Sequence, residues 1–205
     1  RIHALLDGRD VPETSALDYV VPFEAFLQAL STDGFDARIA SGGGRQTITM
    51  DRYDANWPMV ARGWRTHVLG EGPQFANASA AMNGLREMHP GTIDQDLPEF
   101  VIAEFEDNGH GRAIGTIEDG DAVVLLNFRG DRALEITRSF VDDDFSHFDR
   151  VRRPDVSYAG MLQDAGDLQL PKRFLVSPPA IKDTSGEWFS KSGLAQFACS
   201  ETQKF

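Results

Sequence analysis

Apolar and polar positions follow one another in the order expected of alternating strands and helices. Short apolar runs bounded by turn residues predict buried strands, and apolar residues three and four positions apart predict amphipathic helices. The predicted strands cover residues 2–6, 37–40, 100–103, 112–116, 121–127, 158–162, 174–176 and 196–199. The predicted helices cover residues 12–33, the segment from Asp51 to Val68, and residues 78–88, 133–140 and 184–191. This alternation predicts the α/β class, with one domain in which helices flank a mixed, largely parallel sheet in an αβα layering.

The first long helix carries three local signals. Pro12 is expected in its first turn, where the missing N–H of proline removes no hydrogen bond. Gly34 is expected to end the helix. Pro22 lies inside the pattern and should kink the helix or divide it in two. In the next helix, Asp51 or Asp54 is expected to be the N-terminal cap.

The predicted strand at 121–127 differs from the others because its apolar run is continuous. Such a run is typical of a strand that is covered on both faces. Trp57 and Trp64 are spaced as on one helix face, so we expect both to pack in the core. The lone His3 is expected to be a core residue with a satisfied hydrogen bond.

The composition is that of a globular chain. Its 205 residues are 41% hydrophobic and 25% charged, which is enough to bury a core without disulfides. No apolar run approaches the roughly 18 residues that span a bilayer, and no signal-peptide pattern opens the chain. The single Cys199 rules out an intramolecular disulfide and favours a cytosolic setting. It follows an apolar run, so we expect it to be buried.

The net charge is −12, from 32 acidic and 20 basic residues. Such a surface repels phosphate backbones, which argues against general nucleic-acid binding. Sixteen of the 20 bases are Arg, and several of them lie beside Gly after predicted strands. A codon bias toward Arg would explain the ratio equally well, but it does not explain this placement.

Four predicted strands end in loops that carry basic residues. These loops are residues 7–10, 42–45, 129–132 and 200–204. Ligands of α/β proteins bind at the carboxyl ends of strands, and guanidinium groups bind carboxylate and phosphate bidentately. Adjacent glycines let backbone N–H groups approach an oxyanion. If the strands are parallel and adjacent, the loops form one site for a ligand with several anionic groups. For a single Arg, a surface ion pair with a nearby acid is the alternative.

Other chemistry lacks a motif in this sequence. Gly42, Gly43 and Gly44 are not followed by the Gly-Lys-Ser/Thr of a P-loop. The five histidines are scattered, without metal-ligand spacing, and no Gly-x-Ser-x-Gly elbow exists. Motifs alone therefore indicate an anion-binding α/β domain that has neither a nucleophile nor a metal site.

The same loops resemble the motifs of cofactor-independent phosphoglycerate mutases. Residues 3–12 resemble the DGRD segment of that family, residues 41–53 its SGGGR…TMDRY segment, and residues 120–132 its DGDAV…NFRxDR segment. Residues 158–161 and 200–205 match as well. The order and spacing of these motifs agree along essentially the whole chain.

The resemblance implies a part of a cytoplasmic glycolytic isomerase that interconverts 3-phosphoglycerate and 2-phosphoglycerate. Enzymes of the family have a phosphatase-like domain, with two Mn²⁺ ions and a serine that becomes phosphorylated, and an inserted phosphotransferase domain that holds the glycerate. Residues 1–205 resemble most of the inserted domain. The serine and the metal ligands would lie outside the chain, so we expect the isolated chain to be inactive. The start of the inserted domain would also be missing, which predicts a sheet with absent strands and an exposed edge.

The resemblance also assigns roles to residues in the four loops. The expected substrate-binding residues are Arg9, Asp10, Arg45, Arg52, Arg129, Arg132 and Lys204. Asp10 would orient or deprotonate a glycerate hydroxyl, and Lys204 would stabilise charge on the transferring phosphoryl group. The alternatives are a salt bridge to Arg9 or a helix cap for Asp10, and a solvated side chain for Lys204.

The expected partners are the small-molecule substrate and the protein's own phosphatase-like domain. Neither a nucleic acid nor a membrane is expected, and no metal ligand or cofactor is expected within the chain. A non-catalytic anion-binding or interaction module that retains the fold is the alternative function.

Overall fold

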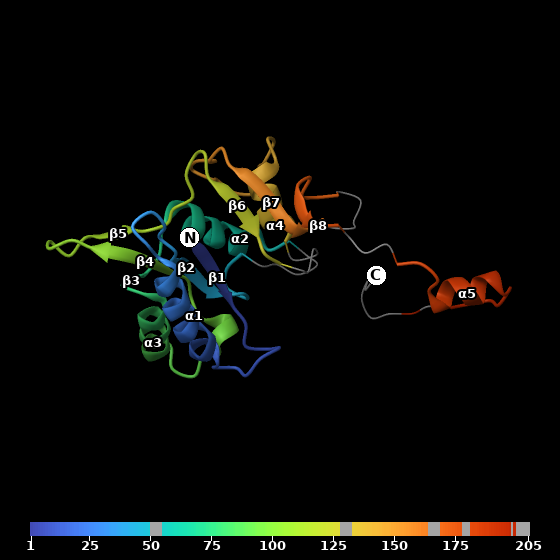
Figure 1. Cartoon of the computed structure of the whole chain (residues 1–205), viewed down its shortest axis with the longest axis horizontal. Coiled ribbons are helices and arrows are strands. Elements are labelled where there is room, and N and C mark those ends of the chain that lie inside the picture. The colour runs from blue at the N-terminus through green and yellow to red at the C-terminus, as the bar shows by residue number, and fades with distance from the viewer. Residues whose placement is uncertain (50–54, 128–132, 164–168, 178–180, 198, 200–205) are drawn as a thin grey trace.

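The computed structural model describes residues 1–49, 55–127, 133–163, 169–177, 181–197 and 199. Its strands form two sheets (Figure 1). The first sheet has the order β1-β2-β4-β3, and β5 extends it by pairing with β4. Its strands are β1 (Ile2–Leu6), β2 (Ile39–Gly44), β3 (Gln74–Phe75), β4 (Phe100–Phe105) and β5 (Gly111–Ala113). β1 and β2 are parallel, β2 and β4 antiparallel, so the sheet is mixed.

The second sheet is parallel and has the order β6-β7-β8. Its strands are β6 (Ala122–Leu125), β7 (Ser157–Leu162) and β8 (Phe174–Val176). The helices are α1 (Ala16–Leu30), α2 (Trp57–Trp64), α3 (Ala78–Met88), α4 (Leu134–Val141) and α5 (Ser185–Lys191), with a π-helical turn η1 (Arg65–Leu69) and a 3₁₀ turn η2 (Asp94–Asp96). None of the described helices is long and apolar enough to cross a membrane. The α/β class and the mixed sheet with flanking helices are confirmed, although the strands divide into two sheets.

Each sheet has its own hydrophobic core. In the first core, α1 and α3 cover one face of β1, β2 and β4, and buried Leu27, Leu85 and Phe100 lie between them. In the second core, α2, η1 and α4 pack on β6 and β7 around Trp64, which is fully buried, and Phe140. Trp64 therefore packs in the core as expected. Trp57 is half-buried and stacks on His147.

The first long helix starts later than the sequence pattern suggests. α1 begins at Ala16, because residues 12–15 form a turn in which the Ser15 N–H donates to the Pro12 carbonyl. It runs through Pro22 without division and ends at Leu30, with Ser31 rather than Gly34 as its C-terminal cap. The expectations of a start at Pro12 and a stop at Gly34 are therefore wrong, and of the kink or division expected at Pro22 the division does not occur.

The glycine-rich run that we expected as a loop is the second half of β2. A Cβ on Gly42 would lie 2.6 Å from the Ala4 carbonyl oxygen, and one on Gly44 would clash with the carbonyl of Gln95. These glycines thus allow neighbouring backbones to approach closely. The Gly44 N–H donates to the Leu97 carbonyl and the Arg45 N–H to that of Leu6. Since these donors are used inside the fold, they do not form the expected oxyanion cradle.

Two expectations about caps and exposure need correction. Asn56 caps α2, because its side chain accepts from the Met59 N–H; Asp51 and Asp54 lie outside the described residues. β6 is not covered on both faces, since Val124 is 51% and the adjoining Leu126 76% exposed.

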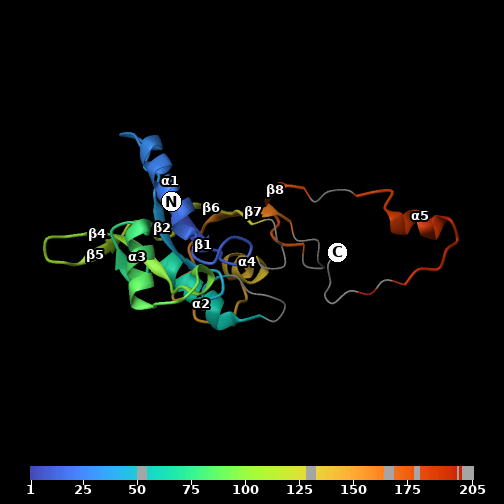
Figure 2. The same ribbon diagram turned by 90° about the horizontal axis from the view of Figure 1, so that it is seen from below.

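The C-terminal region also differs from the expectation. The described residues at 196–199 form no strand, and Cys199 is exposed rather than buried. The helix α5 lies apart from both sheets in two perpendicular views (Figures 1 and 2).

Candidate functional site

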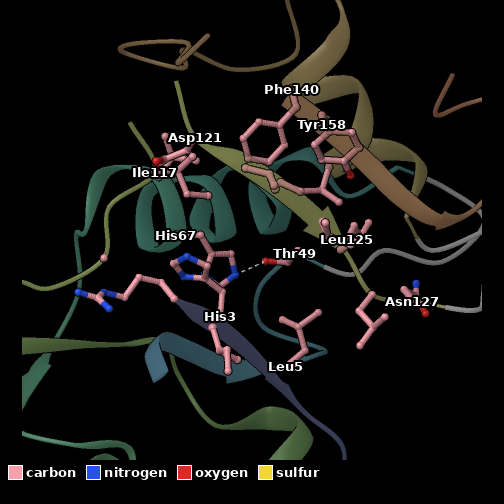
Figure 3. Close-up of a pocket in the computed structure, with 18 of the residues that line it drawn as sticks. His3, Leu5, Thr49, His67, Ile117, Asp121, Leu125, Asn127, Phe140 and Tyr158 are labelled. Carbon is pink, nitrogen blue, oxygen red and sulfur yellow. Dashed lines mark hydrogen bonds between the residues drawn. The ribbon is translucent and has the colours of Figure 1, made fainter. Parts of the chain in front are cut away.

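A cavity of about 770 Å³ lies between β1 and β6. Both strands run in the same direction past it (Figure 3). Apolar side chains of the second core, among them Ile117, Leu125 and Phe140, form one wall. His3, His67 and Thr49 form the opposite wall, and charged residues from the loops after β1 and β2 lie at the carboxyl ends of the strands. The charged end of the cavity is the candidate ligand site, because ligands of α/β sheets bind at the carboxyl ends of strands.

Arg45 and Asp7 form the charged end of this cavity. The Arg45 side chain is 9% exposed, and its Nε lies 2.9 Å from Asp7 Oδ1. The contact is ionic, since this Nε has no aligned hydrogen-bond acceptor among the described residues. Burial would raise the pKa of Asp7. Backbone N–H groups of Gly8, Arg9 and Asp10, together with the charge of Arg45, hold it below its usual value instead.

Arg9 and Asp10 are positioned by the same carboxylate. Their backbone N–H groups donate to Asp7 Oδ1 and Oδ2, each at 3.2 Å, so Asp7 closes the turn after β1. Both side chains are exposed, and Asp10 lines the cavity. Arg9 forms no ion pair with Asp10 in the described part of the chain. Asp10 does not cap α1 either, because that cap is Asp94, whose Oδ2 accepts from the Ala16 N–H at 2.7 Å.

The structure thus brings Asp10 and Arg45 to one end of the cavity, whereas the exposed Arg9 lies in the same turn but does not line it. The other expected site residues, Arg52, Arg129, Arg132 and Lys204, lie outside the described residues. Asn127, the last described residue before the 128–132 segment, lines the same cavity. The loops after β1 and β2 therefore meet as expected, while the meeting of all four loops stays a prediction.

A hydrogen-bonded chain of four buried or half-buried side chains was not expected. His3 Nδ1 lies 2.7 Å from Ser41 Oγ, which lies 2.7 Å from His67 Nδ1. His67 Nε2 in turn lies 2.9 Å from Thr49 Oγ1. Burial lowers the pKa of His3 to about 4 and lowers that of His67 well below its usual value, the latter aided by His3. Both imidazoles are therefore neutral at pH 7.

The sequence carried a signal for only one part of this arrangement. Asp7 stands two residues before Arg9 in a Gly-containing turn, where Asp commonly accepts backbone hydrogen bonds. Ser41, Thr49 and His67 gave no such signal, because the fold alone brings these distant positions together. His3 has the satisfied hydrogen bond that we expected.

Metal ligation was tested against the same residues. Within the part of the chain that the structure describes, no three His, Cys, Asp or Glu side chains gather as a metal ion would require. The described residues of this cavity therefore do not fit a manganese centre.

Comparisons with known proteins agree with the geometry. Residues 1–165 match the family described as BPG-independent PGAM N-terminus. All 205 residues align, at 56% identity, with a probable 2,3-bisphosphoglycerate-independent phosphoglycerate mutase of Leptospira interrogans, and at 52% with the Trypanosoma brucei enzyme. A crystal structure of Leishmania mexicana phosphoglycerate mutase at low cobalt concentration superposes with a TM-score of 0.84, at 52% identity over 99% of this chain.

The chain spans 36% of the length of each of these proteins. The family match covers most of the chain, and the solved structure has the same fold over nearly all of it. The chain therefore belongs to the family of the N-terminal region of 2,3-bisphosphoglycerate-independent phosphoglycerate mutases.

Proposed function

We propose that this chain is the substrate-holding part of a cytoplasmic phosphoglycerate mutase that interconverts 3-phosphoglycerate and 2-phosphoglycerate. The observation that carries the proposal is Arg45, a buried guanidinium at the carboxyl end of β2 whose Nε has no aligned acceptor among the described residues. A buried guanidinium at a strand end favours an anionic ligand, because its several N–H groups can donate to a carboxylate or phosphate besides the Asp7 carboxylate that it already faces. The names of the relatives support the choice of phosphoglycerate.

The proposed reaction has two phosphoryl transfers. In the first, a serine hydroxyl of the absent domain loses its proton and its oxygen bonds to phosphorus, while the bond from phosphorus to the 3-oxygen breaks and that oxygen takes up a proton. In the second, the 2-hydroxyl of the retained glycerate loses its proton and bonds to phosphorus, while the bond from phosphorus to the serine oxygen breaks and the serine regains a proton. Asp10 would orient this hydroxyl or accept the proton, because it lines the cavity next to Arg45.

The arginines would hold the anion between the two transfers. Arg45 and Arg9 would neutralise its carboxylate or phosphate at the ends of β2 and β1, which keeps the glycerate from diffusing away. Arg52, Arg129 and Arg132 complete the proposed cluster, and Lys204 would stabilise charge on the moving phosphoryl group. These four assignments rest on the resemblance of the motifs. The serine and two Mn²⁺ ions belong, in this proposal, to the phosphatase-like domain outside the chain.

We further propose that residues 1–205 are most of the inserted domain but lack its start. Among the described strands, β1 pairs with β2 alone and β6 with β7 alone, so the edges that face the cavity are both unpaired. Tyr19 and Phe26 on α1 are also more than half exposed. A strand added between β1 and β6 would pair both edges, and a right-handed crossover from it to β1 would place its helix beside α1.

Hydrogen exchange tests the missing start. In the full-length protein, we expect amides of β1 and β6 to exchange more slowly than in the 205-residue chain, because new strand pairing would protect them. Amides of α3 serve as the control and should exchange equally in both. Equal exchange of β1 and β6 amides in the two proteins would contradict an added strand.

Mutase assays test the function. We expect the full-length protein to convert 3-phosphoglycerate and the 205-residue chain to show no turnover, because the serine is absent from it. Arg45→Ala in the full-length protein should raise KM for 3-phosphoglycerate, since it removes the buried cation. Binding without any turnover by the full-length protein would favour the non-catalytic anion-binding module instead. An unchanged KM in Arg45→Ala would contradict the assigned site.

A further inference from the structure

Three unusual local features meet on the cavity wall beside Arg45. Thr49 has φ of +68°, a left-handed conformation that is rare for a β-branched residue. His67 lies in η1, a π-helical turn, and such turns occur frequently at functional sites. Gly63 lies against Thr49 so closely that a Cβ there would be 2.9 Å from the Thr49 Cα. Strain of this kind persists where the surroundings hold it in place.

The hydrogen-bonded chain that joins these features allows few proton arrangements. Ser41 Oγ lies between two imidazole Nδ1 atoms, so its O–H donates to one of them and it accepts an N–H from the other. With His67 neutral, its Nε2 then has the opposite role toward Thr49 Oγ1. The burial that keeps both imidazoles neutral is consistent with this pattern. The donor or acceptor role of each side chain therefore fixes the role of its neighbour.

The chain of hydrogen bonds fixes the far end of the loop that carries Arg45. At its near end, the Arg45 N–H donates to the Leu6 carbonyl. At its far end, Thr49 is 3% exposed and is held through its hydroxyl by His67. The π-helical turn thus holds the loop at Thr49. The Thr49 N–H also donates to the Met59 carbonyl, and Arg62 donates to the Thr47 carbonyl. The contact with His67 adds a side-chain anchor at the residue whose backbone is strained.

We propose that His67 is a positioning residue of the phosphoglycerate site. By holding Thr49 and Ser41 it fixes the 45–49 loop, so that the Arg45 guanidinium stays beside Asp7 in the cavity wall. His67 acts through these neighbours and does not touch the substrate. The inference rests on the proposed function, because it assigns His67 a role at the site where Arg45 binds the anion.

Steady-state kinetics of the full-length protein with 3-phosphoglycerate test this role. Thr49→Val keeps the shape of the side chain but removes the hydroxyl that His67 holds. We expect its KM to rise about tenfold while kcat stays within about twofold, because a displaced Arg45 weakens ground-state and transition-state binding together. Thr49→Ser restores the hydroxyl and should restore KM. A merely destabilised protein would show a lower kcat, from fewer active molecules, with an unchanged KM.

Two further variants separate the inference from the proposed function. If Thr49 acts through Arg45, the double variant Arg45→Ala, Thr49→Val should have the KM of Arg45→Ala alone. Ser41→Ala breaks the same chain at another link and should raise KM even if Thr49→Val fails to fold. Absence of 3-phosphoglycerate turnover by the full-length parent protein would overturn the proposed function, and an unchanged KM in Arg45→Ala would overturn the assigned site. A raised KM in Arg45→Ala with an unchanged KM in Ser41→Ala and Thr49→Val, or independent effects in the double variant, would overturn the role of His67 alone.

Discussion

Asp94 lies in the turn η2, which hydrogen-bonds to the loop after β2. Its removal should destabilise the fold strongly. Its carboxylate is fully buried and accepts two hydrogen bonds of 2.7 Å, from the Ala16 N–H at the start of α1 and from Arg86. The adjacent Gln95 carbonyl accepts from Gln46 in the loop after β2. Asp94→Ala therefore removes a helix cap and a buried ion pair, and it disturbs the turn on which the 45–49 loop rests.

The magnitude follows from these two contacts. Loss of an N-terminal cap costs about 1 kcal/mol, and breaking a buried ion pair costs roughly 3–5 kcal/mol. Arg86 is 25% exposed and becomes partly hydrated when its partner is removed, which favours the lower end of that range. We therefore expect the free energy of unfolding to fall by about 3–4 kcal/mol in Asp94→Ala. Asp94→Asn keeps one acceptor for the Ala16 N–H and should lose about 2 kcal/mol.

Urea unfolding of the 205-residue chain, followed by circular dichroism, measures the effect. With a slope of about 2 kcal/mol per molar urea, the midpoint should move down by roughly 1.5–2 M. Asp96→Ala is the matched control, because Asp96 lies exposed on the same 3₁₀ turn, and it should change the free energy by less than about 0.5 kcal/mol. If Asp94→Ala moved the midpoint no further than Asp96→Ala, the contact of Asp94 with Arg86 and α1 would not support the fold.

Three other results are expected. Gly44→Ala should lower the free energy of unfolding by about 2–3 kcal/mol in urea, because its Cβ would meet the Gln95 carbonyl, whereas Gly34→Ala, with nothing within 4 Å, should have little effect. The folded-state pKa of His3, about 4, lies below the roughly 6.5 of an unfolded chain, so its contribution to stability is present above pH 6.5 and is lost as the pH falls toward 4. Urea midpoints at pH 7 and pH 4.5 should differ less in His3→Gln than in the parent chain, and an equal difference would assign the acid sensitivity to other groups. Trp64→Ala should cost about 3–5 kcal/mol of unfolding free energy in the same assay, because Trp64 is fully buried; a loss below 1 kcal/mol would contradict its place in the core.

The periodicity of apolar residues located the helices and strands, but it did not locate every residue at which a helix begins or ends. The start of α1 illustrates this, because Pro12 is a good first-turn residue and the sequence around it reads as helix. The true start at Ala16 depends on Asp94, which lies 78 positions away and reaches the helix only in the folded chain. Such a tertiary cap leaves no local signal. Asn77 and Thr184, which cap α3 and α5 from the adjacent position, mark the helix starts that the pattern located correctly.

The glycines of β2 illustrate a different limit. A Gly-Gly-Gly-Arg run after a short apolar stretch indicates a loop, because glycine is depleted in strands. In the fold, Phe100 and the Ala4 and Gln95 carbonyls lie so close to this strand that a side chain would not fit. The position of Arg45 at a strand end is confirmed, while its role as a substrate-binding residue stays a prediction. The hydrogen-bonded histidines could not be found, because no spacing along the sequence relates residues 3, 41, 49 and 67.

The turn η1 has a consequence for how the two sheets respond to denaturation. Val68 packs in the second core, while the neighbouring His67 hydrogen-bonds to Ser41 of the first sheet. The turn thus contacts both halves of the molecule through His67 and Val68, and neither half can open without removing a buried partner from the other. We therefore expect the two halves to melt in one cooperative transition, although each has its own sheet and its own core.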